Sequence, residues 1–233
     1  MDVLVHNNSV ITALSTCQLF KSVEWHTIKQ LSDSSKLIRL DRGQMVFHSG
    51  ESELGLFLVK SGQVKVSILA SNGSERVIDV VSPGGTFGED GLFSPMLSRL
   101  NAVMLENGEV IEIPRKSIEC CLKKCPALAS SMLSHLGSKL CRLVGELENC
   151  CLRTARQRVI DYLLILANQQ QPGTDQHLNI QLPAGKGVIA SLLDITPETF
   201  SRELNRLNSM GLIQVERKTI QILDLSGMQQ SII

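Results

Sequence analysis

Residues 194–207, "DITPETFSRELNRL", carry the clearest helix signals in the chain. Thr196 is a favourable N-cap residue, and Pro197 fits the first helical position, where its missing N–H leaves no helical hydrogen bond unmade. Apolar residues then recur at the spacing of one buried helix face, namely Phe200, Leu204 and Leu207. This stretch therefore predicts an amphipathic helix whose other face is polar from its first turn.

The residues around this stretch fit a winged helix-turn-helix. Upstream, "TARQ" (154–157) is a capping-box pattern that opens a helix. "KGVIASLL" (186–193) predicts a second, shorter helix, and "GLIQVERKTIQILD" (211–224) predicts two strands around a charged turn. We therefore predict a winged helix-turn-helix over residues 154–233, with the helix of 194–207 as its second helix.

The second helix of such a fold enters the major groove with its N-terminal residues at base edges. Arginine donates to guanine O6 and N7, and a carboxylate accepts from cytosine N4. Glu198 and Arg202 are four residues apart, so we expect them to share a face and to attract each other, which would hold Arg202 extended. The same two residues would also occur on a helix face that is merely exposed to solvent and carries one surface ion pair. The helix cap, the preceding turn and the following wing favour base recognition by this helix. The candidate DNA contacts are Thr196, Glu198, Thr199, Ser201, Arg202 and Asn205.

Two further segments precede this domain. Residues 36–113 contain short apolar or alternating runs closed by Gly, Asn-Gly or Pro-Gly, which predicts a small barrel or roll in a domain of residues 1–126. Residues 127–153 predict a long helix with an a/d heptad seam. We favour a parallel homodimer seam over packing of this helix against its own domain. The seam residues are Leu133, Leu136, Leu140, Leu143, Leu147 and Cys150.

The composition is that of an ordinary globular protein. Of 233 residues, 23 are basic and 23 acidic, which excludes a diffuse nucleic-acid coat but not a local basic surface. No apolar run is long enough to span a membrane, and the first residues lack a secretion signal. With seven cysteines, an odd number, we expect a cytoplasmic protein with mostly free thiols. No nucleophile–base pattern, metal-ligand spacing or Walker loop occurs, so we expect no enzymatic activity.

These features together resemble the Crp/Fnr family of bacterial transcription regulators, from about Phe20 to Leu225. "PETFSRELNRL" is similar to the recognition helix of the Fnr and Dnr branches, whose signature is Glu-x-x-Ser-Arg; Crp-branch members usually carry glycine in place of Ser201. The resemblance implies an α+β protein: a cyclic-nucleotide-binding-like β-roll (jelly roll), a dimerisation helix and a winged helix-turn-helix. It also implies a homodimer on an inverted repeat close to TTGAT-N4-ATCAA, with RNA polymerase as partner. One departure is Asp194, where the family often has glycine.

The same resemblance bears on the effector. "GGTFGEDGLFSPMLSRLNAV" (84–103) resembles the family's phosphate-binding cassette, with Gly88, Glu89 and Arg99 at matching positions. Leu100 and Asn101 stand where the cassette has Ser and a small residue. Cyclic-AMP-responsive members place a Thr-Ser pair in the dimer helix, where this chain has Leu143 and Val144. The implied effector-pocket residues are Gly88, Glu89, Arg99, Leu100, Leu143 and Val144.

Several effectors therefore stay open. We favour haem with nitric oxide, or redox sensing, over cyclic AMP as the effector. One alternative is a cyclic-nucleotide-responsive regulator. Another is a cyclic-nucleotide-binding module that acts on a protein partner. The candidate haem ligands are His6, His26, His48, His135 or a cysteine. An iron–sulfur cluster is disfavoured because Cys17 is alone near the N-terminus and "CCLKKC" (120–125) has no fourth thiol at ligand spacing. A Cys150–Cys150 disulfide across the seam is a further possibility.

Overall fold

The computed structural model describes residues 2–51, 55–93, 97–170 and 178–231, with the backbone alone for residues 2–7. The chain divides into two compact units, residues 1–141 and 142–233, which are described separately below. The division falls within the long helix α5 (Pro126–Leu152), so each unit contains part of that helix.

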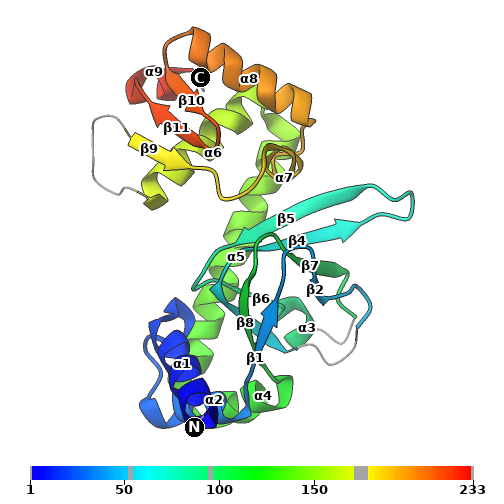
Figure 1. The fold of residues 1–233 in the computed structure, drawn as a ribbon, viewed down its shortest axis with the longest axis vertical. Coiled ribbons are helices and arrows are strands. Elements are labelled where there is room, and N and C mark those ends of the chain that lie inside the picture. The colour runs from blue at the N-terminus through cyan, green and yellow to red at the C-terminus, as the bar shows by residue number, and fades with distance from the viewer. Residues whose placement is uncertain (1, 52–54, 94–96, 171–177, 232–233) are drawn as a thin grey trace. The chain divides into compact units, whose positions relative to one another are not determined.

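The first unit begins with helices and continues as an antiparallel β-roll (Figure 1). α1 (Asp2–Thr16), a 3₁₀ turn (Gln18–Phe20) and α2 (Trp25–Ser34) precede the strands, and α4 (Arg115–Lys124) follows them. The strands form two four-stranded sheets, ordered β1-β8-β3-β6 and β2-β7-β4-β5. Their bounds are β1 Lys36–Leu40, β2 Met45–Phe47, β3 Leu56–Ser61, β4 Val64–Leu69, β5 Glu75–Val81, β6 Thr86–Phe87, β7 Leu100–Met104 and β8 Gly108–Ile113.

Two apolar cores hold this unit together. Between the sheets, Phe47, Phe57 and Phe87 pack with ring centroids 5.2–6.0 Å apart. These are three of only six phenylalanines, and aliphatic side chains fill the rest of the roll. A second core joins the helices to the outer side of β3 and β8; it includes Cys17, Cys121 and Cys125. Burial raises the pKa of the Cys17 and Cys121 thiols, so both are core residues rather than reactive thiolates.

Helix α5 is buried on one side near its start and exposed along the expected seam. Leu128 and Met132 are fully buried in the helical core. By contrast Leu133, Leu140 and Leu147 are 71%, 62% and 65% exposed. Leu136 and Cys150 are partly buried, and Leu136 packs on the core of its own domain. The start of α5 therefore packs against its own domain, whereas Leu133, Leu140 and Leu147 stay largely exposed within the described part of the chain, and the dimer seam stays a prediction.

The second unit is a winged helix-turn-helix, as predicted. Its elements are α6 (Ala155–Gln170), β9 (Leu178–Gln181), α7 (Lys186–Leu192), α8 (Pro197–Ser209), β10 (Ile213–Glu216), β11 (Thr219–Ile222) and α9 (Leu225–Gln230). The three strands form one sheet in the order β10-β11-β9. The predicted capping box is confirmed, since Thr154 N–H donates to Gln157 Oε1 at 2.9 Å and Gln157 N–H donates to Thr154 Oγ1 at 3.4 Å.

The aromatic packing of the β-roll generates a stability prediction. Phe57 is 3% exposed and contacts both other rings of the trio. Phe57→Ala should lower the free energy of unfolding by about 3–5 kcal/mol in urea titrations followed by circular dichroism, because it leaves a cavity between the sheets. The control Leu69→Ala, at a site 59% exposed, should change it by about 0.5 kcal/mol or less. Equal effects of the two variants would contradict this account of the core.

Candidate DNA-binding surface and sensor site

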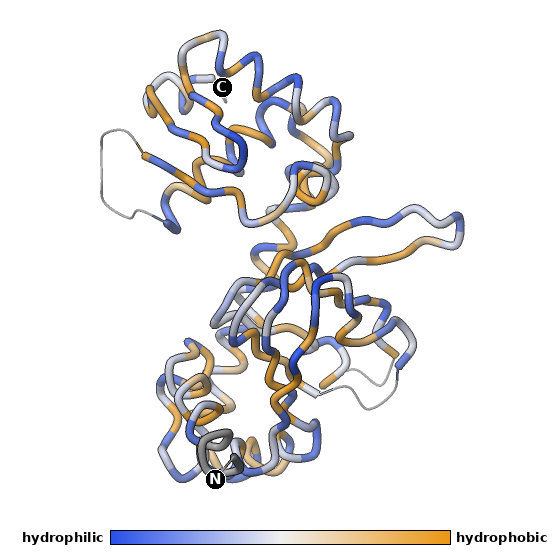
Figure 2. The backbone as a smooth tube through the Cα atoms, in the orientation of Figure 1, coloured by the Kyte–Doolittle hydropathy of each residue, from blue (hydrophilic) through white to orange (hydrophobic). Residues whose placement is uncertain are grey.

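Helix α8 presents the expected polar face. Thr196 caps the helix by accepting a hydrogen bond from the Thr199 N–H at 3.2 Å, as predicted. In Figure 2 hydrophobic and hydrophilic segments alternate along α8, and the apolar side is fully buried. All six candidate DNA contacts lie on or just before this helix. Thr196, Glu198, Arg202 and Asn205 are exposed, while Thr199 and Ser201 are partly exposed.

The expected Glu198–Arg202 ion pair is wrong. Glu198 is fully exposed, and its pKa is lowered by its own backbone N–H and by the Thr196 hydroxyl. Arg202 instead donates to Thr199 Oγ1 at 3.5 Å and lies 4.0 Å from a carboxylate oxygen of Glu203. The reason is position: the first turn of a helix offers unpaired N–H groups and a capping hydroxyl, which are nearer donors for Glu198 than a guanidinium one turn away.

Two polar residues that the sequence analysis missed hold α8 in place. Glu203 is only 8% exposed, on the buried side of α8, and its carboxylate lies 3.4 Å from Arg156 Nε on α6. A glutamate on an otherwise apolar helix face was the signal that could have identified this contact. Arg158, also on α6, donates to backbone carbonyls of the turn before α8. In that turn Asp194 has φ +56°, the left-handed conformation that explains why glycine is common at this position in the family.

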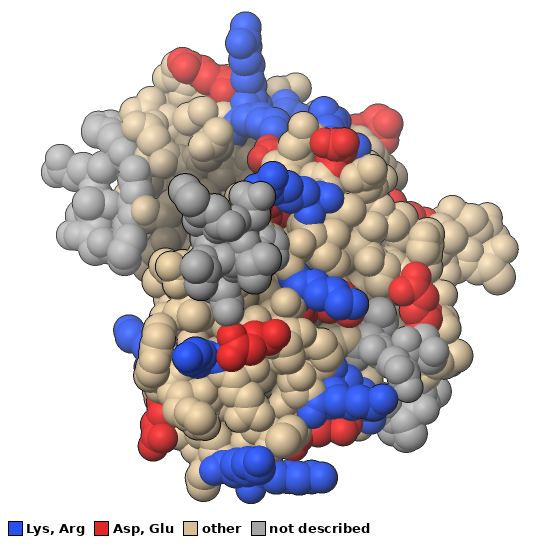
Figure 3. Space-filling model, turned by 60° about the horizontal axis from the view of Figure 1, so that its bottom comes forward, with Lys and Arg blue, Asp and Glu red and all other residues tan. Residues whose placement is uncertain are grey.

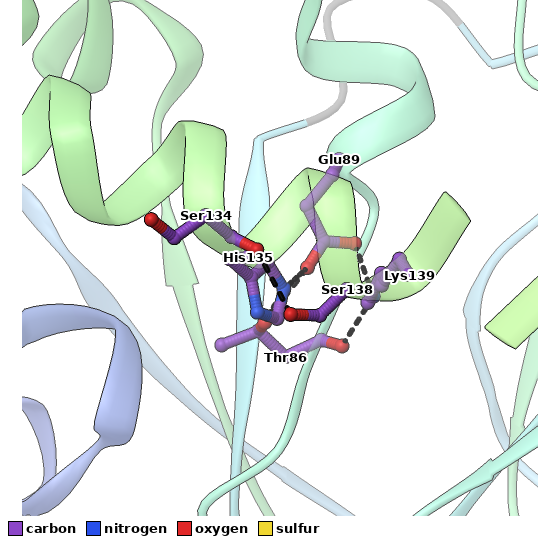
Figure 4. A network of polar contacts seen from close by, with 6 residues as sticks. All are labelled: Thr86, Glu89, Ser134, His135, Ser138 and Lys139. Carbon is purple, nitrogen blue, oxygen red and sulfur yellow. Dashed lines mark hydrogen bonds and ion pairs between the residues drawn. The ribbon is translucent and has the colours of Figure 1, made fainter. Parts of the chain in front are cut away.

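The candidate effector site centres on the buried carboxylate of Glu89, at the start of α3 (Glu89–Phe93) and two residues after the end of β6 (Figure 4). Its Oε1 accepts from Thr86 Oγ1 at 2.7 Å and lies 2.9 Å from His135 Nε2. Its Oε2 accepts from Lys139 Nζ at 2.7 Å, and the same ammonium donates to the Thr86 carbonyl at 3.0 Å. Both carboxylate oxygens are therefore engaged, and the two basic partners come from α5.

The electrostatics of this cluster follow from its burial. The Glu89 side chain is 5% exposed, whereas those of His135 and Lys139 are each 26% exposed. Burial alone raises the pKa of Glu89, but the hydrogen bond from His135 and the charge and hydrogen bond of Lys139 outweigh it and lower the pKa to about 2. The glutamate is therefore ionised throughout the neutral range and bound by its own chain.

The other pocket residues do not join this cluster. Arg99 is exposed and makes no ion pair with Glu89, whose carboxylate is bound by His135 and Lys139 of α5. Leu100 is half-buried in β7, and Leu143 and Val144 are 42% and 56% exposed in the second unit. Gly88 has φ +91°, and a Cβ there would lie 2.8 Å from the Gly55 carbonyl oxygen, so this position requires glycine on steric grounds.

The histidines and cysteines form no metal-binding cluster in the described part of the chain. His26 and His48 are exposed, His135 belongs to the Glu89 cluster, and the side chain of His6 lies outside the described residues. On the surface, basic and acidic side chains are mixed over the face turned forward in Figure 3. Among the described helices none is long and apolar enough to cross a membrane.

Known proteins match both units. Residues 37–125 match the cyclic nucleotide-binding domain model, and residues 157–231 match the Crp-like helix-turn-helix domain model. A CRP-like cAMP-activated global transcriptional regulator from Mycobacterium tuberculosis is 26% identical over 91% of this chain and 94% of its own length.

Solved structures of similar proteins support the same assignment. DNR from Pseudomonas aeruginosa is 30% identical over 94% of this chain and 96% of its own, with a TM-score of 0.50. FixK2 from Bradyrhizobium japonicum shares the fold at 20% identity, with a TM-score of 0.73 over 84% of this chain and 96% of its own. Together with the capped helix α8, the wing and the antiparallel roll, these matches show that the chain belongs to the Crp/Fnr family of transcriptional regulators, with a cyclic-nucleotide-binding-type domain and a DNA-binding helix-turn-helix.

Proposed function

We propose that this regulator binds, as a homodimer, an inverted repeat close to TTGAT-N4-ATCAA in double-stranded DNA. The observation that carries the proposal is the exposed polar face of α8, on which Glu198 and Arg202 flank Ser201 near the capped N-terminus. The G·C pair of the TTGAT half-site offers guanine O6 and N7 to Arg202 and cytosine N4 to Glu198. Both side chains are exposed, and neither depends on the other for its position, since Glu198 interacts with the helix N-terminus and Arg202 with Thr199 and Glu203. RNA polymerase is the expected protein partner, as in the family.

A second copy of the chain supplies the two-fold symmetry of such a site. The seam leucines of α5 form a row of large, exposed apolar side chains, and a parallel partner helix would bury them. Two recognition helices would then read half-sites about 34 Å apart.

We take the effector sensed by the β-roll to be haem with nitric oxide, or redox state, rather than cyclic AMP. A ribose hydroxyl needs a free acceptor site on the carboxylate, and the donors Thr86, His135 and Lys139 already occupy three of the roughly four acceptor sites of Glu89. The exposed Arg99 and the aliphatic Leu143 and Val144 favour the same choice. A cyclic nucleotide is the alternative, since the Mycobacterium tuberculosis relative is described as cAMP-activated. Action on a protein partner alone is disfavoured by the base-reading face of α8.

The DNA proposal predicts the effect of removing one base-reading residue. Arg202→Ala should weaken binding to the TTGAT-N4-ATCAA duplex by about 10- to 100-fold, since a bidentate base contact contributes about 1–3 kcal/mol of discrimination. Fluorescence anisotropy with labelled duplexes measures this, and binding to a scrambled duplex should change much less. The control Arg39→Ala removes an arginine whose side chain is 83% exposed in the β-roll, and it should leave binding unchanged.

The same titration tests the effector. Reduced, purified protein is titrated with and without saturating cyclic AMP, and we expect equal affinity in both. Nucleotide-dependent tightening would establish the cyclic-nucleotide alternative and would overturn our choice of effector. An absence of preference for the inverted repeat over its scramble, with every potential effector tested, would overturn the assigned operator.

The dimer proposal predicts the result of placing charge in the seam. Leu140→Asp combined with Leu147→Asp should convert the dimer to monomer in sedimentation-velocity experiments at micromolar concentration, because two pairs of like charges would face each other across the parallel helices. Ser138→Asp, at an exposed position of α5 outside the seam, is the matched control and should remain dimeric. If the double variant sediments as the wild type does, the seam is misassigned.

The Glu89 cluster predicts an acid-dependent loss of stability. Because the pKa of Glu89 is lowered from 4.5 to about 2 in the folded protein, its stabilising contribution is complete above about pH 4.5 and is lost as the pH falls towards 2. At pH 7, Glu89→Gln should lower the free energy of unfolding by about 1.5–3 kcal/mol in urea titrations. This deficit should shrink between pH 5 and pH 3. Glu119→Gln, which removes a more exposed pair with Arg115, should cost about 0.5 kcal/mol or less at every pH.

A further inference from the structure

Arg158 on α6 reaches the turn that precedes the recognition helix. Its Nη1 donates to the carbonyl oxygens of Leu193 and Asp194 at 3.0 and 2.9 Å, and it lies 3.8 Å from the Asp194 carboxylate. The arginine side chain is 15% exposed, whereas that of Asp194 is 46% exposed. The guanidinium is therefore directed at the protein backbone and is largely withdrawn from solvent.

The turn that Arg158 contacts has a strained residue at its centre. It joins the end of α7 at Leu192 to the N-cap Thr196, and Asp194 takes φ +56° within it. Only glycine adopts this left-handed conformation without steric cost, although aspartate tolerates it better than most residues. Because Asp194 carries a Cβ in this conformation, the turn depends more on contacts from outside itself than a glycine turn would.

Arg158 also contacts the link between α5 and α6. Its Nε donates to the Arg153 carbonyl oxygen at 3.2 Å, and Arg153 is one of only two residues between those helices. The Arg153 side chain forms an ion pair with Asp161 on α6 and lies 3.8 Å from Glu148 on α5. One guanidinium thus joins three backbone carbonyls, one from the interhelical link and two from the turn before α8.

We infer that Arg158 is a positioning residue for DNA recognition: it fixes the left-handed turn at Asp194 and thereby the place and direction in which α8 begins. This inference rests on the proposed DNA binding by α8. The planar guanidinium donates from two separate nitrogens, Nε and Nη1, in directions fixed by one rigid plane, whereas all donors of an ammonium lie on a single nitrogen, so lysine is not an equivalent replacement. A direct contact of Arg158 with DNA phosphate is the competing role, and it predicts different results.

The test combines Arg158 variants with changes at the turn. Arg158→Ala should weaken binding to the TTGAT-N4-ATCAA duplex at least about 10-fold in anisotropy titrations, and Arg158→Lys should recover only part of this loss, because one ammonium replaces the fork. Adding Asp194→Gly to Arg158→Ala should restore affinity to within about 3-fold of wild type, since glycine takes the turn conformation unaided. The matched control is Arg158→Ala with Asp194→Ala, which removes the same carboxylate without freeing the backbone and should not restore binding.

Salt dependence separates positioning from phosphate contact. If Arg158 acts on the turn, the slope of log affinity against log salt concentration stays as in wild type; loss of one phosphate contact in each subunit of the dimer would lower it by about two. Circular dichroism and melting curves establish that each variant is folded. If Arg158→Ala does not fold, the comparison is made with Arg158→Lys, alone and with Asp194→Gly or Asp194→Ala.

Each outcome decides one question. Rescue by glycine but not by alanine, with an unchanged salt slope, supports the positioning role. Wild-type affinity in Arg158→Ala, equal rescue by both substitutions, no rescue by either, or a reduced salt slope would overturn it. Failure of the wild-type protein itself to prefer the inverted repeat would overturn the proposed function instead, and is recognised before any variant is compared.

Discussion

The position of α5 against the β-roll depends on the burial of one charge. Glu89 follows a short strand inside the roll and is almost fully removed from water, and an ionised carboxylate there is tolerated only with charged or polar donors on both oxygens. The sheets supply only the Thr86 hydroxyl, and the two basic donors come from α5. Satisfying this carboxylate therefore requires α5 to lie against the β-roll at His135 and Lys139. These two residues lie between Leu133 and Leu140 of the predicted seam.

The DNA-binding domain uses a related principle. Its recognition helix is apolar on the buried side except for Glu203, which requires Arg156 of α6 as its counter-charge. The turn ahead of the helix similarly relies on the guanidinium of Arg158. Arg156 and Arg158, both on α6, thus hold α8 itself and the turn that precedes it. Apolar packing alone permits some sliding and rotation of one helix on another, whereas directed hydrogen bonds do not.

The sequence predicts most of the fold because its signals are local. Caps, turn glycines and apolar periodicity act within a few residues, and Thr154, Thr196 and the strands of the roll were all identified in this way. The basic partners of Glu89 lie 46 and 50 residues away, so no local spacing rule could find them, and the resemblance to the phosphate-binding cassette concerned a ligand rather than α5. The Glu198–Arg202 pair failed for another reason: the spacing was right, but the helix N-terminus competes for the same carboxylate.

The cluster at Glu89 also constrains how an effector can act on this protein. A ligand that takes over the acceptor sites used by His135 or Lys139 displaces a donor on α5 and thereby weakens the contact between the β-roll and that helix. A ligand that binds elsewhere in the roll leaves the cluster intact and must move α5 and β6 together. In both cases His135 and Lys139 are the points at which an event in the β-roll becomes a change in the long helix. Under the proposed function, the donors to Glu89, and not the pocket residues alone, are therefore where a signal in the β-roll acts on α5.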